Sequence, residues 1–170
     1  MLFNGENGNP SMSKDLLGLA QESIDIEYNA SKLYTIFRDT FPEDADFWWQ
    51  LVIEENNHAG LIRCGIDQFM SEGLFPEEIL TDAIPDLVEA NKKITSLIED
   101  YQKDPPSRKT AFNVALKMEM SAGVIHFQQA MEQPALSKVM EIFQELNQND
   151  KNHIARIKAY MKEKGIGITP

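Results

Sequence analysis

The residues of this chain whose types and spacing could do chemistry are four acids and two histidines. They are Glu27, Glu55 with His58 three residues later, Glu119, and Asp150 with His153 three residues later. Each acid lies on the apolar stripe of an expected helix, where a carboxylate is costly unless something compensates its charge. Positions i and i+3 share a helix face, so each acid–histidine pair can offer one oxygen and one nitrogen to the same side. Carboxylate and imidazole together suit iron or manganese, and zinc also enters such sites.

The spacing of the acids around two expected turns places them at a common depth. The two acids of each half lie 13 to 16 residues from the proline between them, which is Pro42 in the first half and Pro134 in the second. At ~1.5 Å per helical residue, every acid lies roughly 20 Å from its turn. Four ionised carboxylates at one depth would repel one another, and two divalent cations would balance their charge. The sequence therefore predicts a site for two metal ions.

Helical periodicity accounts for nearly the whole chain and supplies the elements that must position these residues. It predicts four main helices over about 14–39, 43–72, 107–132 and 134–164. Short turns join the first helix to the second and the third to the fourth, so each pair should form an antiparallel hairpin.

The connection between the two hairpins is long and contains a helix of its own, over about 85–103. Such a helix spans ~28 Å, close to the length of a bundle, so the connection can cross from one end to the other. The prediction is an all-α fold, a four-helix bundle with one long helix-containing crossover. We expect the domain to cover 14–165, with a flexible tail over 1–13 and a short tail over 166–170.

Composition narrows the cellular setting and the classes of partner. A chain of 170 residues fits one domain, and its net charge of −11 argues against nucleic acid or an anionic membrane as a partner. Cys64 is the single cysteine, so a disulfide within the chain is excluded and a reducing compartment fits best. No apolar run approaches the roughly 20 residues that span a bilayer, and 1–13 lacks the pattern of a signal peptide. We therefore expect a cytoplasmic protein.

The set of acids and histidines resembles the ligands of the ferritin-like di-iron carboxylate superfamily, and it is most similar to that of rubrerythrin-type proteins. The resemblance covers about 14–164 and implies a ferritin-like four-helix bundle that binds two iron ions, with manganese or zinc as alternatives. It implies that Glu55 and Asp150 bridge the ions, that Glu27 and His58 complete one, and that Glu119 and His153 complete the other. Tyr34 matches a tyrosine that rubrerythrins place near the metals, where it could donate a hydrogen bond or supply an electron; an ordinary core aromatic is the alternative.

The sequence departs from the rubrerythrin pattern in three ways. Asp150 stands where a glutamate is usual, and its side chain is shorter by about 1.3 Å, a difference that matters for chemistry. Ala122 stands where rubrerythrins often carry another glutamate, and His126 could substitute as a ligand or be a buried structural residue. A rubredoxin-like cysteine module is missing, so electrons would come from a separate donor.

Three functions follow from this pattern as alternatives. The first is an oxidoreductase whose di-iron site reacts with peroxide or dioxygen, in a small oligomer such as a homodimer. The second is an iron-binding or storage protein without turnover, and the third is a metal-free ferritin-like interaction module. The aromatic residues 47–49 are expected to pack internally or to form a dimer contact. Glu54 points about 100° away from Glu55 around the helix, so we expect it to be solvated.

Overall fold

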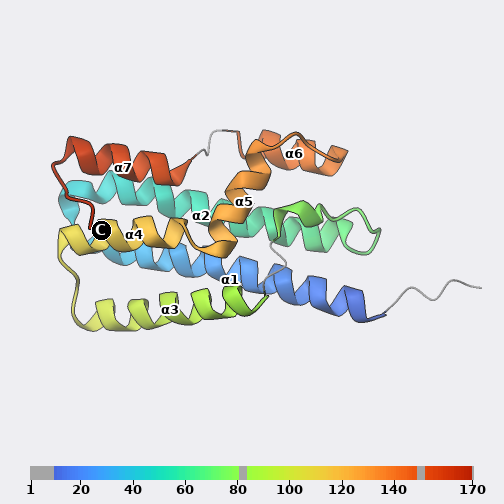
Figure 1. The fold of residues 1–170 in the computed structure, drawn as a ribbon, viewed down its shortest axis with the longest axis horizontal. Helices are drawn as coiled ribbons and strands as arrows, with labels where there is room; N and C mark the ends of the chain where they lie inside the picture. Colours follow the sequence, from blue (N-terminus) through green and yellow to red (C-terminus); the bar gives the residue numbers. More distant parts are fainter. Residues whose placement is uncertain (1–9, 81–83, 149–151, 170) are drawn as a thin grey trace, which may run out of the picture.

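The computed structural model describes residues 10–80, 84–148 and 152–169, and Figure 1 shows their arrangement. Within these ranges the regular elements are all helical, so the prediction of an all-α fold is confirmed. The α-helices are α1 (Pro10–Thr40), α2 (Ala45–Phe69), α3 (Ile84–Lys103), α4 (Arg108–Glu119), α5 (Ala122–Glu132), α6 (Lys138–Leu146) and α7 (His153–Glu163). Two short 3₁₀ turns, η1 (Pro42–Asp44) and η2 (Glu77–Ile79), precede α2 and α3.

Helices α1, α2, α4 and α7 lie lengthwise along the molecule, and α3 runs beside α1 (Figure 1). Helices α1 and α2 form an antiparallel hairpin through η1, where Pro42 starts the turn at a position that needs no N–H donor. Helix α3 then returns along the length of the molecule, so that α4 starts at the same end as α2 and runs parallel to it. A helix is present where one was expected over 85–103, as α3.

The buried side chains form two apolar clusters with polar residues between them. One cluster is built around Tyr34, Trp48 and Phe112, and the other around Phe127 and Phe143. Along α2, Val52 belongs to the first cluster and Ala59 to the second, and the buried Glu55 and His58 lie between them. The change from apolar to polar and back along one buried stripe marks the layer in which the candidate ligands lie.

Two of the expected helices are not continuous. The third is broken between α4 and α5, where Ser121 is extended with φ −73° and ψ 155°. The fourth is broken before α7, where Asn152 has the left-handed conformation, φ 51° and ψ 65°, and its side chain accepts a hydrogen bond from the N–H of Ala155. Asparagine favours helix caps because its side chain competes for backbone hydrogen bonds, as at Asn152, whereas the Ser121 hydroxyl makes no such cap bond. The helical periodicity continues through both breaks and therefore conceals them.

The ends of several helices follow the sequence signals, with one exception. Ser107 caps α4 by accepting a hydrogen bond from the N–H of Thr110, and Gly73, with φ 66°, follows the end of α2. Helix α1, however, begins at Pro10, inside the segment 1–13 that was expected to be a tail. No helix in the described ranges is long and apolar enough to cross a membrane.

The buried carboxylate of Asp44 connects the ends of three helices through hydrogen bonds at one end of the molecule. Asp44, at the start of α2, accepts hydrogen bonds from Nε and Nη2 of Arg108, both at 2.6 Å. It also accepts one from the hydroxyl of Tyr160, at 2.8 Å. Arg108 begins α4 and Tyr160 lies near the end of α7. The helices that carry Glu55, Glu119 and His153 are thus fixed to one another by a residue outside the site.

Candidate metal site

Five of the six predicted ligands come together in the centre of the molecule. Glu27 comes from α1, Glu55 and His58 from α2, Glu119 from the last residue of α4, and His153 from the first residue of α7. Each of the five is at most 1% exposed. The sixth, Asp150, lies outside the described residues.

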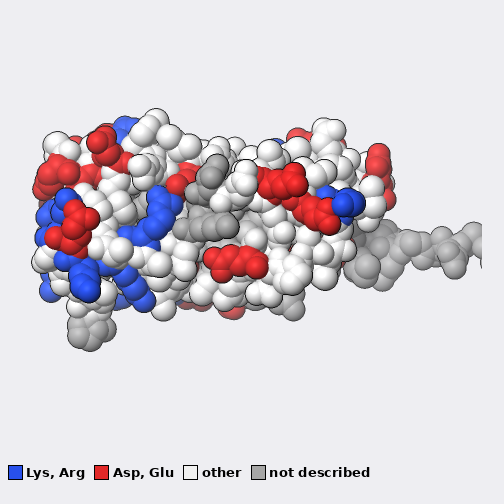
Figure 2. Space-filling model, turned by 90° about the horizontal axis from the view of Figure 1, so that it is seen from above, with Lys and Arg blue, Asp and Glu red and all other residues white. Residues whose placement is uncertain are grey.

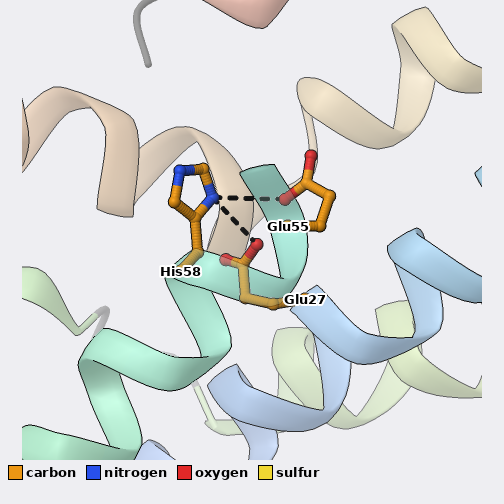
Figure 3. Close-up of side chains that lie close together, drawn as sticks. All are labelled: Glu27, Glu55 and His58. Carbon is orange, nitrogen blue, oxygen red and sulfur yellow. Dashed lines mark hydrogen bonds and ion pairs between the residues drawn. The ribbon is translucent and has the colours of Figure 1, made fainter. Parts of the chain in front are cut away.

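The first group consists of Glu27, Glu55 and His58. The Nδ1 atom of His58 lies 3.2 Å from Oε2 of Glu55 and 3.4 Å from Oε2 of Glu27. Figure 3 shows the imidazole directed at both carboxylates, which approach it from α1 and from the preceding turn of α2. One ligand atom from each residue lies within 4.8 Å of the others, a spacing that a single metal ion can bridge.

The second group consists of Glu55, Glu119 and His153. The Nδ1 atom of His153 lies 3.0 Å from Oε1 of Glu55 and 3.2 Å from Oε2 of Glu119. Glu55 therefore faces the first group with Oε2 and the second with Oε1. The two imidazole rings lie 5.4 Å apart at 19°, nearly parallel. Two groups of three ligands thus share one carboxylate.

Tyr34 reaches the same layer from α1. Its hydroxyl donates a short hydrogen bond to Oε1 of Glu119, and its ring stacks on Trp48 with a centroid distance of 5.6 Å. Burial, reinforced by the negative charge of Glu119, holds the pKa of Tyr34 well above its ordinary value of 10. The phenol therefore stays protonated and acts as a fixed donor to this carboxylate.

Gln128 of α5 is a second donor to Glu119, and no pattern in the sequence indicated this role. Its Nε2 donates to Oε2 of Glu119 at 2.8 Å. Because Gln128 follows the break between α4 and α5, its direction cannot be read from the periodicity of a continuous helix. Glu119 is consequently held at both oxygens, by Tyr34 on one and by Gln128 on the other.

Glu54 was expected to be solvated, and that expectation is wrong. Its side chain is 17% exposed, and its Oε2 lies 3.2 Å from Nε2 of His153 and 2.6 Å from Nη1 of Arg156. The direction 100° from Glu55 points toward α7 and not toward water. A carboxylate on the outer nitrogen of an imidazole fixes the ring and its tautomer, so the inner Nδ1 is left to face the site.

His126 does not join either group. It is half-buried on α5, and its Nε2 lies 3.1 Å from the backbone carbonyl oxygen of Glu78. Cys64 is exposed, so thiolate plays no part in the site. His126 therefore connects α5 to η2 in this structure and does not lie among the candidate ligands.

Burial and mutual charge set the protonation of the three carboxyls. Burial, followed by the charge of Glu55, raises the pKa of Glu27 to about 8, against a lowering by His58. The same two causes raise the pKa of Glu119. Burial alone would also raise the pKa of Glu55, but the two neighbouring histidines outweigh it and hold that pKa well below its ordinary value. The shared carboxylate is thus ionised, and the outer two favour protons.

This donor set fits divalent metal ions. Among the described residues no lysine or arginine pairs with Glu27, Glu55 or Glu119, so the only positive charge offered to them is that of the histidines. Buried carboxylates that lack a cation are costly, and metal ions would compensate them. Protein-family models, curated proteins and solved structures were compared with the chain, and none of them matches it.

Proposed function

We propose that this protein is a di-metal carboxylate protein of rubrerythrin type, an oxidoreductase whose two iron ions react with peroxide or dioxygen. The observation that carries the proposal is the shared carboxylate of Glu55, which faces one histidine-containing group with each oxygen. A single-metal site would need only one of the two groups. Two groups joined by a bridging carboxylate are what a di-metal centre requires.

The proposed ligand roles follow the two groups. Glu27 and His58 would hold one ion, Glu119 and His153 the other, and Glu55 both. Asp150 is proposed as a second bridge. The fold that we propose is a ferritin-like four-helix bundle in which α3 is the crossover, because α1, α2, α4 and α7 each carry a member of the site or its contacts.

When bound, a pair of ferrous ions supplies two electrons to the O–O bond of peroxide, which with two protons becomes two water molecules. The residues of the chain prepare the site for this chemistry. Tyr34 keeps a proton on its hydroxyl at Oε1 of Glu119. Glu54 holds His153 by its outer nitrogen, and the apolar clusters on either side limit bulk water. A separate donor would return the electrons, since the lone cysteine of the chain is exposed.

The proposal is tested by loading the protein anaerobically with ferrous iron and measuring metal content, anomalous scattering at the iron edge and the response to hydrogen peroxide. We expect two ions per chain beside the five ligands and a ferric spectrum within seconds. Glu55→Gln should lose both ions, whereas the exposed Glu99→Gln should keep them. Fewer than one ion per chain would contradict the proposal, and bound iron that peroxide leaves unchanged would favour a metal-binding protein without turnover.

A further inference from the structure

A cavity of about 460 Å³ adjoins the site and is lined mainly by amides. Residues from α5, α6 and the segment on either side of the break before α7 line it: Gln128, Met131, Glu132, Gln144, Asn147, Gln148 and Asn152. Gln128 links the cavity to the site, because the same side chain that lines the cavity donates to Oε2 of Glu119. Beyond Gln128, therefore, the next polar group is a proposed metal ligand.

The chemistry of this lining suits a cation. Among the residues that the structure describes, the lining includes no lysine or arginine, and its carboxylate is that of Glu132. The Nε2 atom of Gln144 donates to the carbonyl oxygens of Ala130 and Gln133, and that of Gln128 is engaged by Glu119. The amide oxygens of Gln128 and Gln144 can therefore coordinate an ion that enters the cavity. Amide and carboxylate oxygens can replace the water ligands of a hard divalent ion.

The outer side of His153 is occupied by an ion pair. There Glu54 lies between His153 and the guanidinium of Arg156, which also contacts Oε1 of Gln50 at 3.4 Å. Arg156 keeps its charge at any physiological pH, so Glu54 already has a cationic partner on this side of His153. On the face that Figure 2 shows, lysine and arginine side chains gather mainly over the end opposite to α6, and acidic side chains lie over both ends and the middle.

We propose that divalent transition-metal ions enter and leave the buried site through the amide-lined cavity, with Gln128 as the residue that must turn away from Glu119 to let them pass. The inference rests on the proposed metal function, because it concerns the route to that same site. A route is needed since all five ligands are at most 1% exposed. Substitution of a residue that lines the route but does not bind the metal should change the rates of metal uptake and release by the same factor. The dissociation constant should then stay unchanged.

The test is stopped-flow uptake of Co²⁺, followed by its visible absorption, with release measured by transfer to a chelator. Gln148 is exposed and lines the cavity, so Gln148→Trp should fill the cavity without replacing any of the five described ligands. Both rate constants should fall together, with an unchanged equilibrium affinity. Gln102→Trp, which adds the same bulk at an exposed position of α3, is the matched control and should bind Co²⁺ at the wild-type rates.

Charge at the same position gives a second test that needs no change of shape in the cavity. A unit charge roughly 10 Å from a divalent ion changes its local concentration about fourfold in water. Gln148→Lys should therefore slow uptake by about that factor and Gln148→Glu should speed it, and the difference should vanish at 1 M salt. Wild-type rates in all three Gln148 variants, or a change in the dissociation constant alone, would refute the proposed entry route and leave the proposed metal site intact. Failure of the wild-type protein to bind Co²⁺ at equilibrium would overturn both proposals.

Discussion

Replacing Glu27 by glutamine should make the metal-free protein more stable at alkaline pH. Glutamine keeps the size of the side chain and its ability to bond to His58, but it cannot ionise. Burial raises the pKa of Glu27 from 4.5 to about 8 in the folded state. The stabilisation associated with this group is therefore complete below pH 4.5 and is lost as the pH rises through about 8.

The size of the effect follows from the same two values. Each unit of pKa difference corresponds to about 1.4 kcal/mol, so the wild-type protein should lose roughly 3 kcal/mol of unfolding free energy between pH 5 and pH 8 through Glu27. The variant lacks this loss. It should exceed the wild type by roughly 4 kcal/mol at pH 8 and by less than about 1 kcal/mol at pH 5.

Urea denaturation in the presence of a chelator, at pH 5 and pH 8, measures the difference. Glu99→Gln, an exposed carboxyl on α3, is the control and should leave stability nearly unchanged at both values. Added metal should reverse the order at pH 8, because the wild type gains binding energy that the variant has lost. A glutamine variant that is less stable than the wild type at pH 8 without metal would refute the reasoning.

Three further predictions concern positions outside the metal ligands. In α2, Gly65→Ala should destabilise the protein by roughly 1–3 kcal/mol, because the added Cβ would lie 2.8 Å from the ring of Phe75. Gly60→Ala, where nothing lies within 4 Å of the added Cβ, should stabilise the protein by roughly 0.5–1 kcal/mol. Thermal unfolding of both variants measures the two effects, and effects of the same sign would contradict the packing. Asp44→Asn removes the charge that accepts three hydrogen bonds and should cost about 2 kcal/mol in urea denaturation; a loss below about 0.5 kcal/mol would show that the connection is weak. Burial and the hydrogen bond to Asp44 raise the pKa of Tyr160 to about 12. A pH titration followed by absorbance at 295 nm should therefore show a tyrosinate step at high pH, which Tyr160→Phe removes and Asp44→Asn moves to lower pH. An unchanged titration curve in both variants would be inconsistent with the contact.

The sequence was sufficient to predict an all-helical chain and the meeting of the five described ligands, because both depend on spacing along single elements. An acid on an apolar stripe of α1, α2 or α4 must face the core wherever the helix packs. Glu27, Glu55 and Glu119 are buried for that reason. Helix α3 was predicted from its periodicity and from the prolines that follow it.

The contacts around the ligands could not be predicted, because they depend on how separate elements are rotated against one another. Glu54 faces α7 only because α7 packs on that side of α2. Gln128 reaches Glu119 because the chain turns at Ser121, a local departure that the periodicity does not record. Asn152 caps the start of α7 at a point where the apolar pattern continues without a break. There local hydrogen bonding overrides the pattern of burial.

The two groups of ligands differ in how much of the chain must be in place before they can form. Glu27 and His58 are 31 residues apart on one hairpin, whereas Glu55 and His153 are separated by 98 residues. Closing the longer loop costs more conformational entropy and comes later in folding, since local contacts form first. The α1–α2 hairpin can therefore assemble its three ligands early, even during synthesis. The first metal position would then be a folding nucleus onto which α4 and α7 bring the second.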